Sequence, residues 1–136
     1  MSYQLDTSTC IEILRGRLEF ARTAMLELPK SSFALSTVVV GELLLGVEKN
    51  PASAKNRLAV ERFIEAFDLV PLDAQAARSY AVLRAELERA GRRIGGNDML
   101  IAACAISRGA TLVTNNVKEF RRIPSLSLES WGEIEF

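Results

Sequence analysis

The sequence contains no histidine. This absence excludes Ser-His-Asp and Cys-His catalysis, acid–base chemistry by imidazole and most zinc sites. An enzyme built from this chain must therefore work with carboxylates, hydroxyls, amides, lysine, arginine or a metal ion held by oxygen ligands.

Cysteine is scarce as well. The two cysteines, Cys10 and Cys104, are far apart in the chain, lie among apolar neighbours and form no CxxC motif. This pattern is typical of a reducing cytoplasmic environment rather than of a disulfide framework.

Long apolar runs and a signal-like start are also missing. The longest apolar runs fall far short of the roughly 20 residues that span a bilayer. The first residues, MSYQLDTST, lack the basic start and the apolar core of a signal peptide. We therefore expect a cytoplasmic protein without a membrane segment.

The chain has no net charge, because 17 Lys and Arg balance 17 Asp and Glu. Proteins that coat nucleic acid without specificity are usually basic, so contact with RNA or DNA must come from a local basic patch. The candidates are three arginine pairs, for which a solvated surface is the plain alternative. These pairs are Arg15 and Arg17, Arg92 and Arg93, and Arg121 and Arg122.

The pattern of strands and helices predicts an α/β fold. With 136 residues, of which 49% are hydrophobic, the chain suits one domain over residues 1–136. Strand patterns alternate with helix patterns, which indicates a three-layer α/β/α sandwich around a mostly parallel sheet. The predicted strands are YQLDT, FALS, LVPL (expected to be buried), ATLVT and SLSLES. The predicted helices cover CIEILRGR, Leu18–Leu28, the segment around Glu42, Ala54–Phe67, the segment after Asp73, and DMLIAACAIS.

Local signals indicate where these helices begin and end and which face is buried. Gly91 and Gly109 are expected to end the two helices that precede them. In the helix Ala54–Phe67, the side chains expected to face inward are Leu58, Phe63 and Phe67. The expected N-terminal caps are Thr7 or Ser8, Ser36 or Thr37, Asp73, and Asn97.

Several polar residues are expected at one edge of the sheet. In an open parallel sheet, ligands bind outside the carboxyl ends of the strands. If the predicted sheet is parallel, its carboxyl edge brings together residues from four separate segments. These residues are the acids Asp6, Glu42, Asp98 and Glu119 and the polar residues Thr7, Thr114 and Asn116.

Each acid also has a structural alternative. Asp6 suits a helix cap, and Asp98 suits a helix N-terminus, where a carboxylate contributes about 0.3–1 kcal/mol. Glu119 alone would be a solvated helix residue. Glu42 is harder to explain in this way, because an unpaired buried carboxylate is costly and residues 31–48 contain no Lys or Arg.

Gathered carboxylates without imidazole or thiolate form a hard oxygen site that suits Mg²⁺ or Mn²⁺. Such an ion activates water and offsets the charge that develops on a phosphodiester. Metal-dependent phosphodiester hydrolysis is therefore the leading prediction. A non-catalytic α/β module that binds RNA or acts as a scaffold is one alternative. An aspartate phosphotransfer protein is another, disfavoured because the first strand lacks a DxDx(T/V) motif.

Three sequence blocks carry a resemblance to a known family. They are LDTS at Leu5–Ser8, VVVGELLLGVEK at Val38–Lys49, and GGNDMLIAACAISRGATLVTNNVKEFRRIPSLSLESW at Gly95–Trp131. In this order and spacing they resemble a PIN domain, and more narrowly the VapC-type toxins of bacterial toxin–antitoxin modules. The resemblance runs almost from end to end of the chain.

The resemblance implies an Mg²⁺- or Mn²⁺-dependent endoribonuclease that cuts tRNA or another structured RNA. It also implies a homodimer, inhibited by a VapB-like antitoxin that inserts a segment into or near the acidic cleft. The family's acidic positions fall on Asp6, Glu42 and Asp98. Its usual fourth position holds Asn116 here, so Glu119 is the expected substitute. Whether one ion binds or two stays open.

We predict the following division of roles among these residues. Asp6 and Asp98 are expected to hold the principal metal ion, and Glu42 to complete or orient its shell. Glu119 is expected to help with a second ion or to position water. The residues expected to supply hydrogen bonds are Thr7, Thr114 and Asn116. The arginines expected to contact RNA are Arg92, Arg93, Arg15 and Arg121, with Arg17 and Arg122 beside them.

Overall fold

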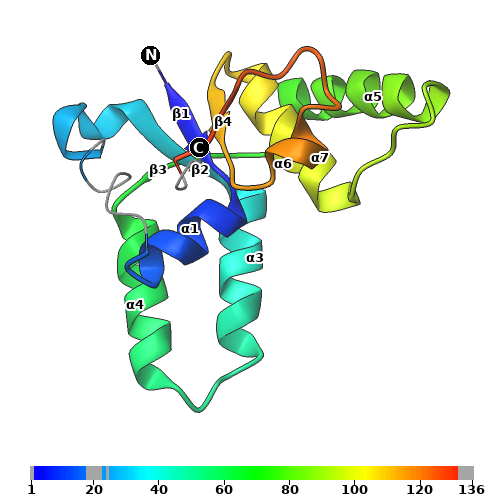
Figure 1. Cartoon of the computed structure of the whole chain (residues 1–136). Helices are drawn as coiled ribbons and strands as arrows, with labels where there is room; N and C mark the ends of the chain where they lie inside the picture. Colours follow the sequence, from blue (N-terminus) through cyan, green and yellow to red (C-terminus); the bar gives the residue numbers. More distant parts are fainter. Residues whose placement is uncertain (1, 18–22, 24, 132–136) are drawn as a thin grey trace.

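The computed structural model describes residues 2–17, 23 and 25–131, so most of the predicted helix Leu18–Leu28 lies outside the described residues. Figure 1 shows the elements in chain order. They are β1 Tyr3–Leu5, α1 Thr7–Leu14, a 3₁₀ turn η1 Lys30–Ser32, β2 Phe33–Ser36, α3 Thr37–Glu48, α4 Ala54–Glu65, β3 Asp68–Val70, α5 Ala74–Arg89, α6 Gly96–Ser107, β4 Thr111–Val113, α7 Val117–Phe120 and β5 Leu128–Glu129.

The strands form one five-stranded sheet in the order β3-β2-β1-β4-β5. All four strand pairs are parallel, and Tyr3 of β1 lies opposite both Phe33 of β2 and Thr111 of β4. The predicted parallel α/β sheet is therefore confirmed. The strand order, which the sequence patterns left open, places β1 at the centre. The first and fourth strands are neighbours, so residues that follow them meet at the same edge.

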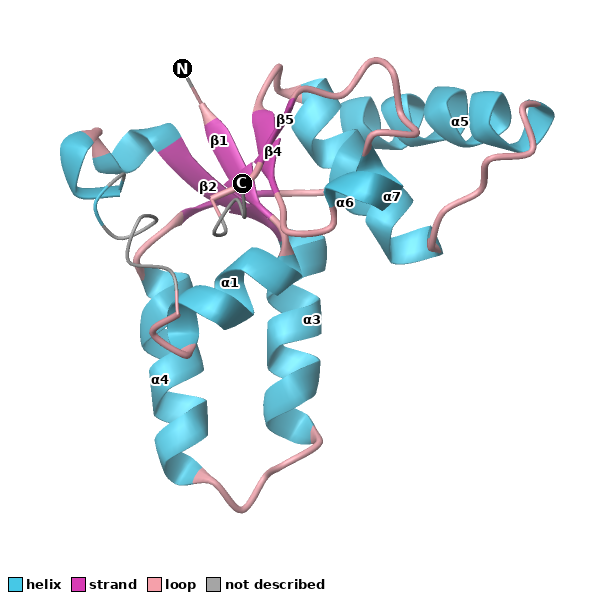
Figure 2. Ribbon diagram, viewed as in Figure 1, coloured by secondary structure: helices cyan, strands magenta, loops and turns pink. Residues whose placement is uncertain are grey.

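Helices in two groups flank the sheet, as the predicted three-layer sandwich requires (Figures 1 and 2). Helix α1 packs against α3 and α4, which forms one group. Helix α5 packs along α6, and α6 also contacts β2 and β4. Within the described ranges, no helix is long and apolar enough to cross a membrane.

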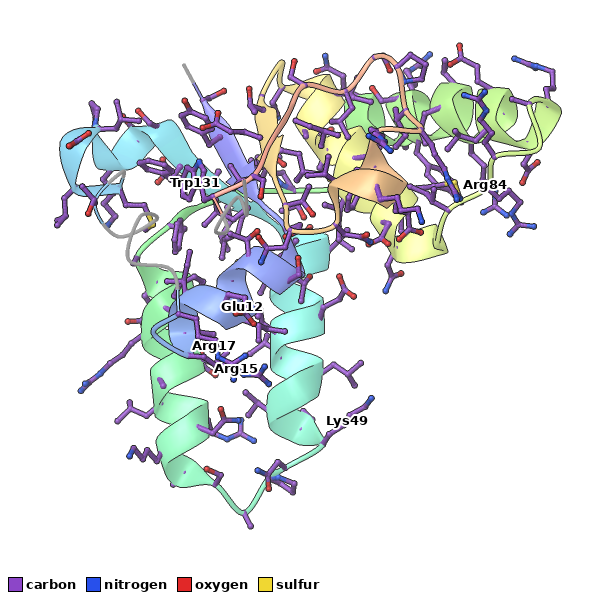
Figure 3. The ribbon with its side chains drawn as sticks, viewed as in Figure 1. Glu12, Arg15, Arg17, Lys49, Arg84 and Trp131 are labelled. Atoms are coloured by element: carbon purple, nitrogen blue, oxygen red, sulfur yellow. The ribbon has the colours of Figure 1, made fainter. Side chains whose placement is uncertain are left out.

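Helix α6 is packed closely into the core because its inner face consists largely of small residues. Ala102, Ala103, Cys104 and Ala105 are completely buried. Both cysteines are buried and free, as their apolar neighbours predicted. Beside the sheet, the rings of Tyr3, Phe33 and Trp131 stand 5.6–5.7 Å apart, and Figure 3 places Trp131 next to the strands.

The caps of two helices differ from the prediction. Asp6, not Thr7 or Ser8, caps α1 through a hydrogen bond from the Thr9 amide. Helix α6 begins one residue before Asn97, so the prediction that Asn97 caps it was wrong. The turn into α6 occurs instead at Gly95, whose amide is bonded to a side chain from another part of the chain.

Other helix ends follow the predicted signals. Ser36 accepts a hydrogen bond from the Val39 amide at the start of α3, and Asp73 caps α5 in the same way. Gly91 and Gly109 follow the ends of α5 and α6 with φ angles of 65° and 61°. This left-handed conformation is the one that favours glycine after a helix.

Two predictions of burial were wrong. The side chain of Leu58 is 51% exposed, because α4 turns Val60 rather than Leu58 into the core. The predicted buried strand LVPL overlaps β3 at Leu69 and Val70, and Leu69 is 48% exposed because β3 is an edge of the sheet. Phe67, at 7% exposure, faces inward as predicted and packs against Phe63.

The difference in burial between Phe67 and Leu58 can be tested by truncating each side chain to alanine. Phe67→Ala should lower the free energy of unfolding by about 3–5 kcal/mol, because it leaves a cavity in the core. Leu58→Ala should lower it by about 1 kcal/mol or less, because half of that side chain is already in water. Urea denaturation measures both values. Equal losses in the two variants would contradict the observed rotation of α4.

Candidate active site

The four acids predicted to converge come from four different elements around the carboxyl ends of β1 and β4. Asp6 follows β1 directly, and Thr114 follows β4. The remaining acids lie on helices that begin near this edge, with Glu42 on α3, Asp98 on α6 and Glu119 on α7. All of the sequence-predicted acids and supporting polar residues therefore belong to one region.

Asp6 is the most tightly held of the four acids. Its side chain is buried, at 4% exposure. Its Oδ1 accepts hydrogen bonds of 2.9 Å from the Thr9 amide and from the Ser8 hydroxyl. Its Oδ2 accepts a bond from the hydroxyl of the buried Thr114 and a second bond, of 3.1 Å, from Ser8. Asp6 is thus a helix cap and a member of the acidic site at once, so the two interpretations are compatible.

Glu42 is oriented by a neighbouring hydroxyl. The Thr7 hydroxyl donates to Glu42 Oε1 at 2.8 Å and thereby links the start of α1 to α3. Glu42 is half-buried. The residue after the first aspartate therefore contacts a carboxylate, as the sequence analysis expected for Thr7.

Glu119 is joined to Asp6 by a short chain of hydrogen bonds. The Asn116 side-chain amide donates to Glu119 Oε2 at 2.6 Å, and the Asn116 backbone amide donates to the Thr114 hydroxyl at 2.9 Å. That hydroxyl in turn donates to Asp6. A further bond of 3.2 Å runs from the Gly95 amide to Glu119 Oε1. Asn116 therefore orients the carboxylate that lies one turn further along the chain.

The pKa of Asp98 is affected by all three of the other acids. Burial of its carboxyl group is the largest cause that raises its pKa, followed by the negative charges of Glu119, Glu42 and Asp6 and a hydrogen bond with Glu119. Together they raise the pKa of Asp98 to about 6. A carboxyl group affected in this way by three like charges lies within the same electrostatic environment as all of them.

No lysine or arginine forms an ion pair with these acids in the part of the chain that the structure describes. Every ion pair there involves other acids, such as Arg57 with Glu48 and Arg108 with Asp73. The acids instead receive hydrogen bonds from hydroxyls and amides. An all-oxygen donor set of uncompensated carboxylates fits a hard divalent cation.

The described residues do not form a complete set of metal ligands as they stand. Among the described residues, no three Asp, Glu or Cys side chains stand close enough together to hold an ion as they are. The site therefore fits Mg²⁺ or Mn²⁺ by the chemistry and charge of its donors, and metal binding stays a prediction.

The arginine pairs divide into two groups. Arg15 and Arg17 lie at the end of α1 close to Glu12 (Figure 3). A guanidinium nitrogen of Arg15 is 3.9 Å and one of Arg17 is 3.6 Å from Glu12 Oε1. Arg92 and Arg93 lie between α5 and α6, and the other pair follows α7. Arg122 donates to the Arg93 carbonyl at 3.2 Å, so two of the three pairs meet beside the acidic site.

Two contributors to the site were missed by the sequence analysis. Ser8 was considered only as a helix cap, although its hydroxyl donates to both oxygens of Asp6. Its position two residues after an aspartate at a strand end is the signal that was available. Gly95 contributes a backbone amide, and a Cβ at this position would meet Asp98 Oδ2 at 3.5 Å. No side chain signals such a role.

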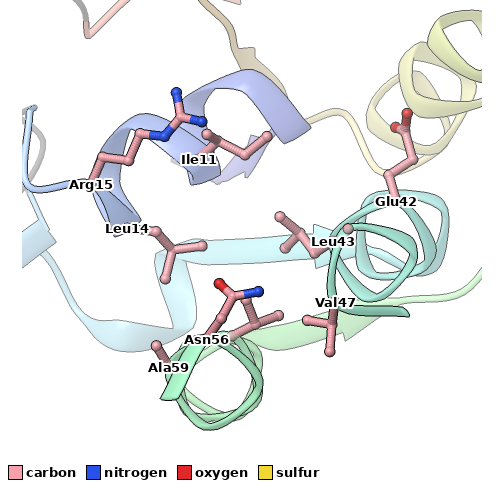
Figure 4. A pocket seen from close by; sticks show the side chains of 10 residues that line it. Ile11, Leu14, Arg15, Glu42, Leu43, Val47, Asn56 and Ala59 are labelled. Carbon is pink, nitrogen blue, oxygen red and sulfur yellow. The ribbon is translucent and has the colours of Figure 1, made fainter. Parts of the chain in front are cut away.

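A groove extends from the acidic site between α1, α3 and α4 (Figure 4). This helical groove has a volume of about 310 Å³. Its lining is mostly apolar, with Glu42 and Arg15 among its few polar residues. The residues that line it are Ile11, Leu14, Arg15, Glu42, Leu43, Gly46, Val47, Asn56, Ala59 and Val60.

Comparisons with known proteins agree with this architecture. Residues 3–126 match the family model of the PIN domain. The chain is 39% identical over 134 residues to "Ribonuclease VapC2" of Rickettsia felis, a match that covers 98% of this chain and 100% of that protein. It is also 39% identical over 131 residues to the "tRNA(fMet)-specific endonuclease VapC" of Salmonella typhimurium, covering 96% and 98%.

Solved structures give the same result. The VapBC2 complex from Rickettsia felis, bound to a DNA fragment from its promoter, contains a chain with a TM-score of 0.89 and 38% identity, covering 96% of this chain and 99% of that one. DNA-bound VapBC from Salmonella typhimurium contains one with a TM-score of 0.90 and 39% identity, covering 96% and 98%.

The raised pKa of Asp98 predicts a dependence of stability on pH. Between the ordinary value of 3.8 and the folded value of about 6, the folded protein binds more protons than the unfolded chain. The stability contribution of Asp98 is therefore fully present below pH 4 and is lost as the pH rises through 6. Because the group is partly exposed and screened, we expect a loss of about 1 kcal/mol in chelating buffer. Asp98→Asn should remove this loss. Identical pH profiles of the two proteins in urea denaturation would contradict the assignment.

Proposed function

Because this chain belongs to the PIN-domain family and, within it, to the VapC ribonucleases, we propose that Asp6, Glu42 and Asp98 form the metal-dependent centre with which it hydrolyses RNA. The observation that carries this proposal is the convergence of four acids, none of which forms an ion pair with a basic side chain of the described residues. Mutual repulsion of such acids disfavours the empty, fully ionised site. A bound divalent cation would relieve it.

The chain's own residues hold this centre in shape. Bound Mg²⁺ or Mn²⁺ would supply an activated water and offset the charge that develops on the phosphate. Asp6 accepts bonds from three donors, so its carboxylate is oriented before any ligand arrives. Asp98 has a raised pKa of about 6 and is therefore only half-ionised at that pH, so its affinity for a cation should increase as the pH rises through 6.

Glu119 is proposed as the fourth acid. Its carboxylate raises the pKa of Asp98, and the Asn116 amide fixes its direction. Asn116, which stands at the family's usual fourth acidic position, thus orients the carboxylate of Glu119, which lies one turn later in the chain. This arrangement supports a role for Glu119 in positioning water or a second ion.

A structured RNA is the proposed substrate. The relatives from Salmonella typhimurium and Shigella flexneri are named tRNA(fMet)-specific endonucleases. We infer that this chain also cuts a tRNA. The basic residues beside the acids, Arg92, Arg93 and Arg121, would contact its phosphates, with Arg15 at the far end of the helical groove. A scaffold without catalysis is less well supported, because all three family acids are present.

A VapB-like antitoxin is the proposed partner. The similar solved structures from Rickettsia felis, Salmonella typhimurium and Haemophilus influenzae are VapBC complexes. We propose that an apolar antitoxin segment occupies the helical groove and reaches the acids past Glu42. A homodimer, a single domain over residues 1–136 and a cytoplasmic location stay predictions.

The catalytic assignment is tested by two amide substitutions. Asp6→Asn and Asp98→Asn should each lower the rate of tRNA cleavage in Mg²⁺ at least 100-fold, because each removes a negative ligand of the proposed metal. Asp73→Asn, which changes a helix cap far from the site in sequence, is the matched control and should retain cleavage. Gel analysis of a tRNA transcript measures all three. Cleavage at the normal rate by both site variants would refute the assignment.

The partner assignment is tested by filling the groove. Gly46 and Gly41 both lie in α3, and at both positions a Cβ would have no atom within 4 Å, but only Gly46 lines the groove. Gly46→Leu should weaken binding of the cognate antitoxin at least tenfold in calorimetry, whereas Gly41→Leu should not. Neither should destabilise the fold, because glycine is the poorer helix former by about 1 kcal/mol. Equal affinities of both variants would place the antitoxin elsewhere.

A further inference from the structure

A second, smaller hollow lies behind the arginine pairs, between the last turns of α5 and the segment that follows α7. This α5 hollow has a volume of about 140 Å³. Its inner surface is apolar and built mainly from the core. Leu83, Leu87 and Ile123, each 3% exposed, line it together with Ala90 and Pro124.

Charged side chains line the same hollow. Arg92 and Arg122 contribute guanidinium groups, and Glu86 contributes a carboxylate. Within the described residues, the side chain of Arg92 has neither an ion pair nor a hydrogen bond, and that of Arg122 bonds only to a backbone carbonyl. The hollow thus combines an apolar surface with two donors and one acceptor.

The α5 hollow is tied to the acidic site by two cross-links between the same segments. The Gly95 amide bonds to Glu119 at 3.2 Å, and Arg122 bonds to the Arg93 carbonyl at 3.2 Å. Arg93 and Gly95 are two residues apart, so the second link lies at most about 7 Å of extended chain from the first. The hollow therefore lies on the same two linked segments that carry Gly95 and Glu119 at the acidic site.

We propose that the α5 hollow binds one unpaired nucleotide of the RNA substrate next to the bond that is cut. This inference rests on the proposed ribonuclease function. The base would lie on the apolar surface, its phosphate would meet Arg92, and its polar edge would face Glu86. Sequence-specific readers of RNA commonly take up single bases that are splayed out of loops, with arginine planes and carboxylates as partners.

Charge complementarity favours a nucleotide over an apolar occupant. The hollow offers two positive groups at its opening, and the neighbouring acids offer the place where a phosphodiester would react. A purely apolar ligand would leave the Arg92 guanidinium without a partner. A nucleotide satisfies the apolar surface and the charged opening together.

The experiment uses the full chain and one mapped RNA. The cleaved bond is first located on tRNA(fMet), or on whichever member of a total tRNA pool the protein cuts. The same RNA is then synthesised with an abasic ribose at each of the two nucleotides that flank this bond. Ala90→Trp fills the hollow from an exposed position, and Ala81→Trp, on the exposed surface of the same helix outside the hollow, is the matched control.

With the intact RNA, Ala90→Trp should raise KM about five- to 100-fold, and loss of the flanking base should raise the wild-type KM by a similar factor. With the abasic RNA, Ala90→Trp should cause no further loss, because the contact is already gone. Ala81→Trp should match the wild type on both RNAs. The inference is overturned if Ala90→Trp acts equally on intact and abasic RNA, or if its kinetics equal those of Ala81→Trp.

The charged opening gives an independent readout. Arg92→Met should lower the slope of log KM against log salt concentration by about 0.7, the value for one phosphate contact to a single strand. Arg84→Met, on α5 outside the hollow and paired with Glu88, should leave the slope unchanged. An unchanged slope in Arg92→Met overturns the phosphate contact. A wild-type chain that cuts no RNA would instead refute the ribonuclease proposal itself, and this inference with it.

Discussion

Mutual repulsion among four carboxylates is the constraint on which the rest of this site depends. Burial and then the negative charges of Glu119, Glu42 and Asp6 raise the pKa of Asp98, and no basic side chain of the described residues is paired with any of these acids. The fold tolerates this arrangement because hydroxyls and amides hold the carboxylates apart and in fixed directions. Such a cluster stores unfavourable electrostatic energy that a bound cation releases. The stability of the empty protein and its affinity for metal are therefore two consequences of the same interaction.

The parallel sheet explains how distant residues reach this cluster. Strands β1 and β4 are neighbours and end at the same edge, so Asp6 and Thr114 meet although they are 108 residues apart. Hydrogen bonds through Asn116 and Gly95 then bring α7 and the start of α6 to the same place. Two arginine pairs, Arg92 with Arg93 and Arg121 with Arg122, lie on the same segments. The proposed RNA contacts and the proposed metal site therefore depend on the same part of the fold. Displacing either segment should therefore disturb both functions together.

The sequence alone was informative about the acids because their local patterns conflicted with ordinary packing. Glu42 in an apolar helix had no nearby basic partner, and Asp6 stood at the carboxyl end of a predicted strand, where ligands of a parallel sheet bind. The orientation of α4 was less accessible, since Leu58 and Val60 are both apolar and only tertiary contacts decide which one is buried. The role of Gly95 is carried by its backbone amide, which side-chain patterns do not report. The meeting of two arginine pairs likewise depends on the loop geometry.

The most direct test of the central claim is anomalous diffraction from crystals soaked in Mn²⁺. The account predicts one strong anomalous peak between the carboxylates of Asp6 and Asp98, which is absent from crystals of Asp98→Asn soaked in the same way. A peak bound elsewhere on the chain, or one between these residues that persists in Asp98→Asn, would contradict it.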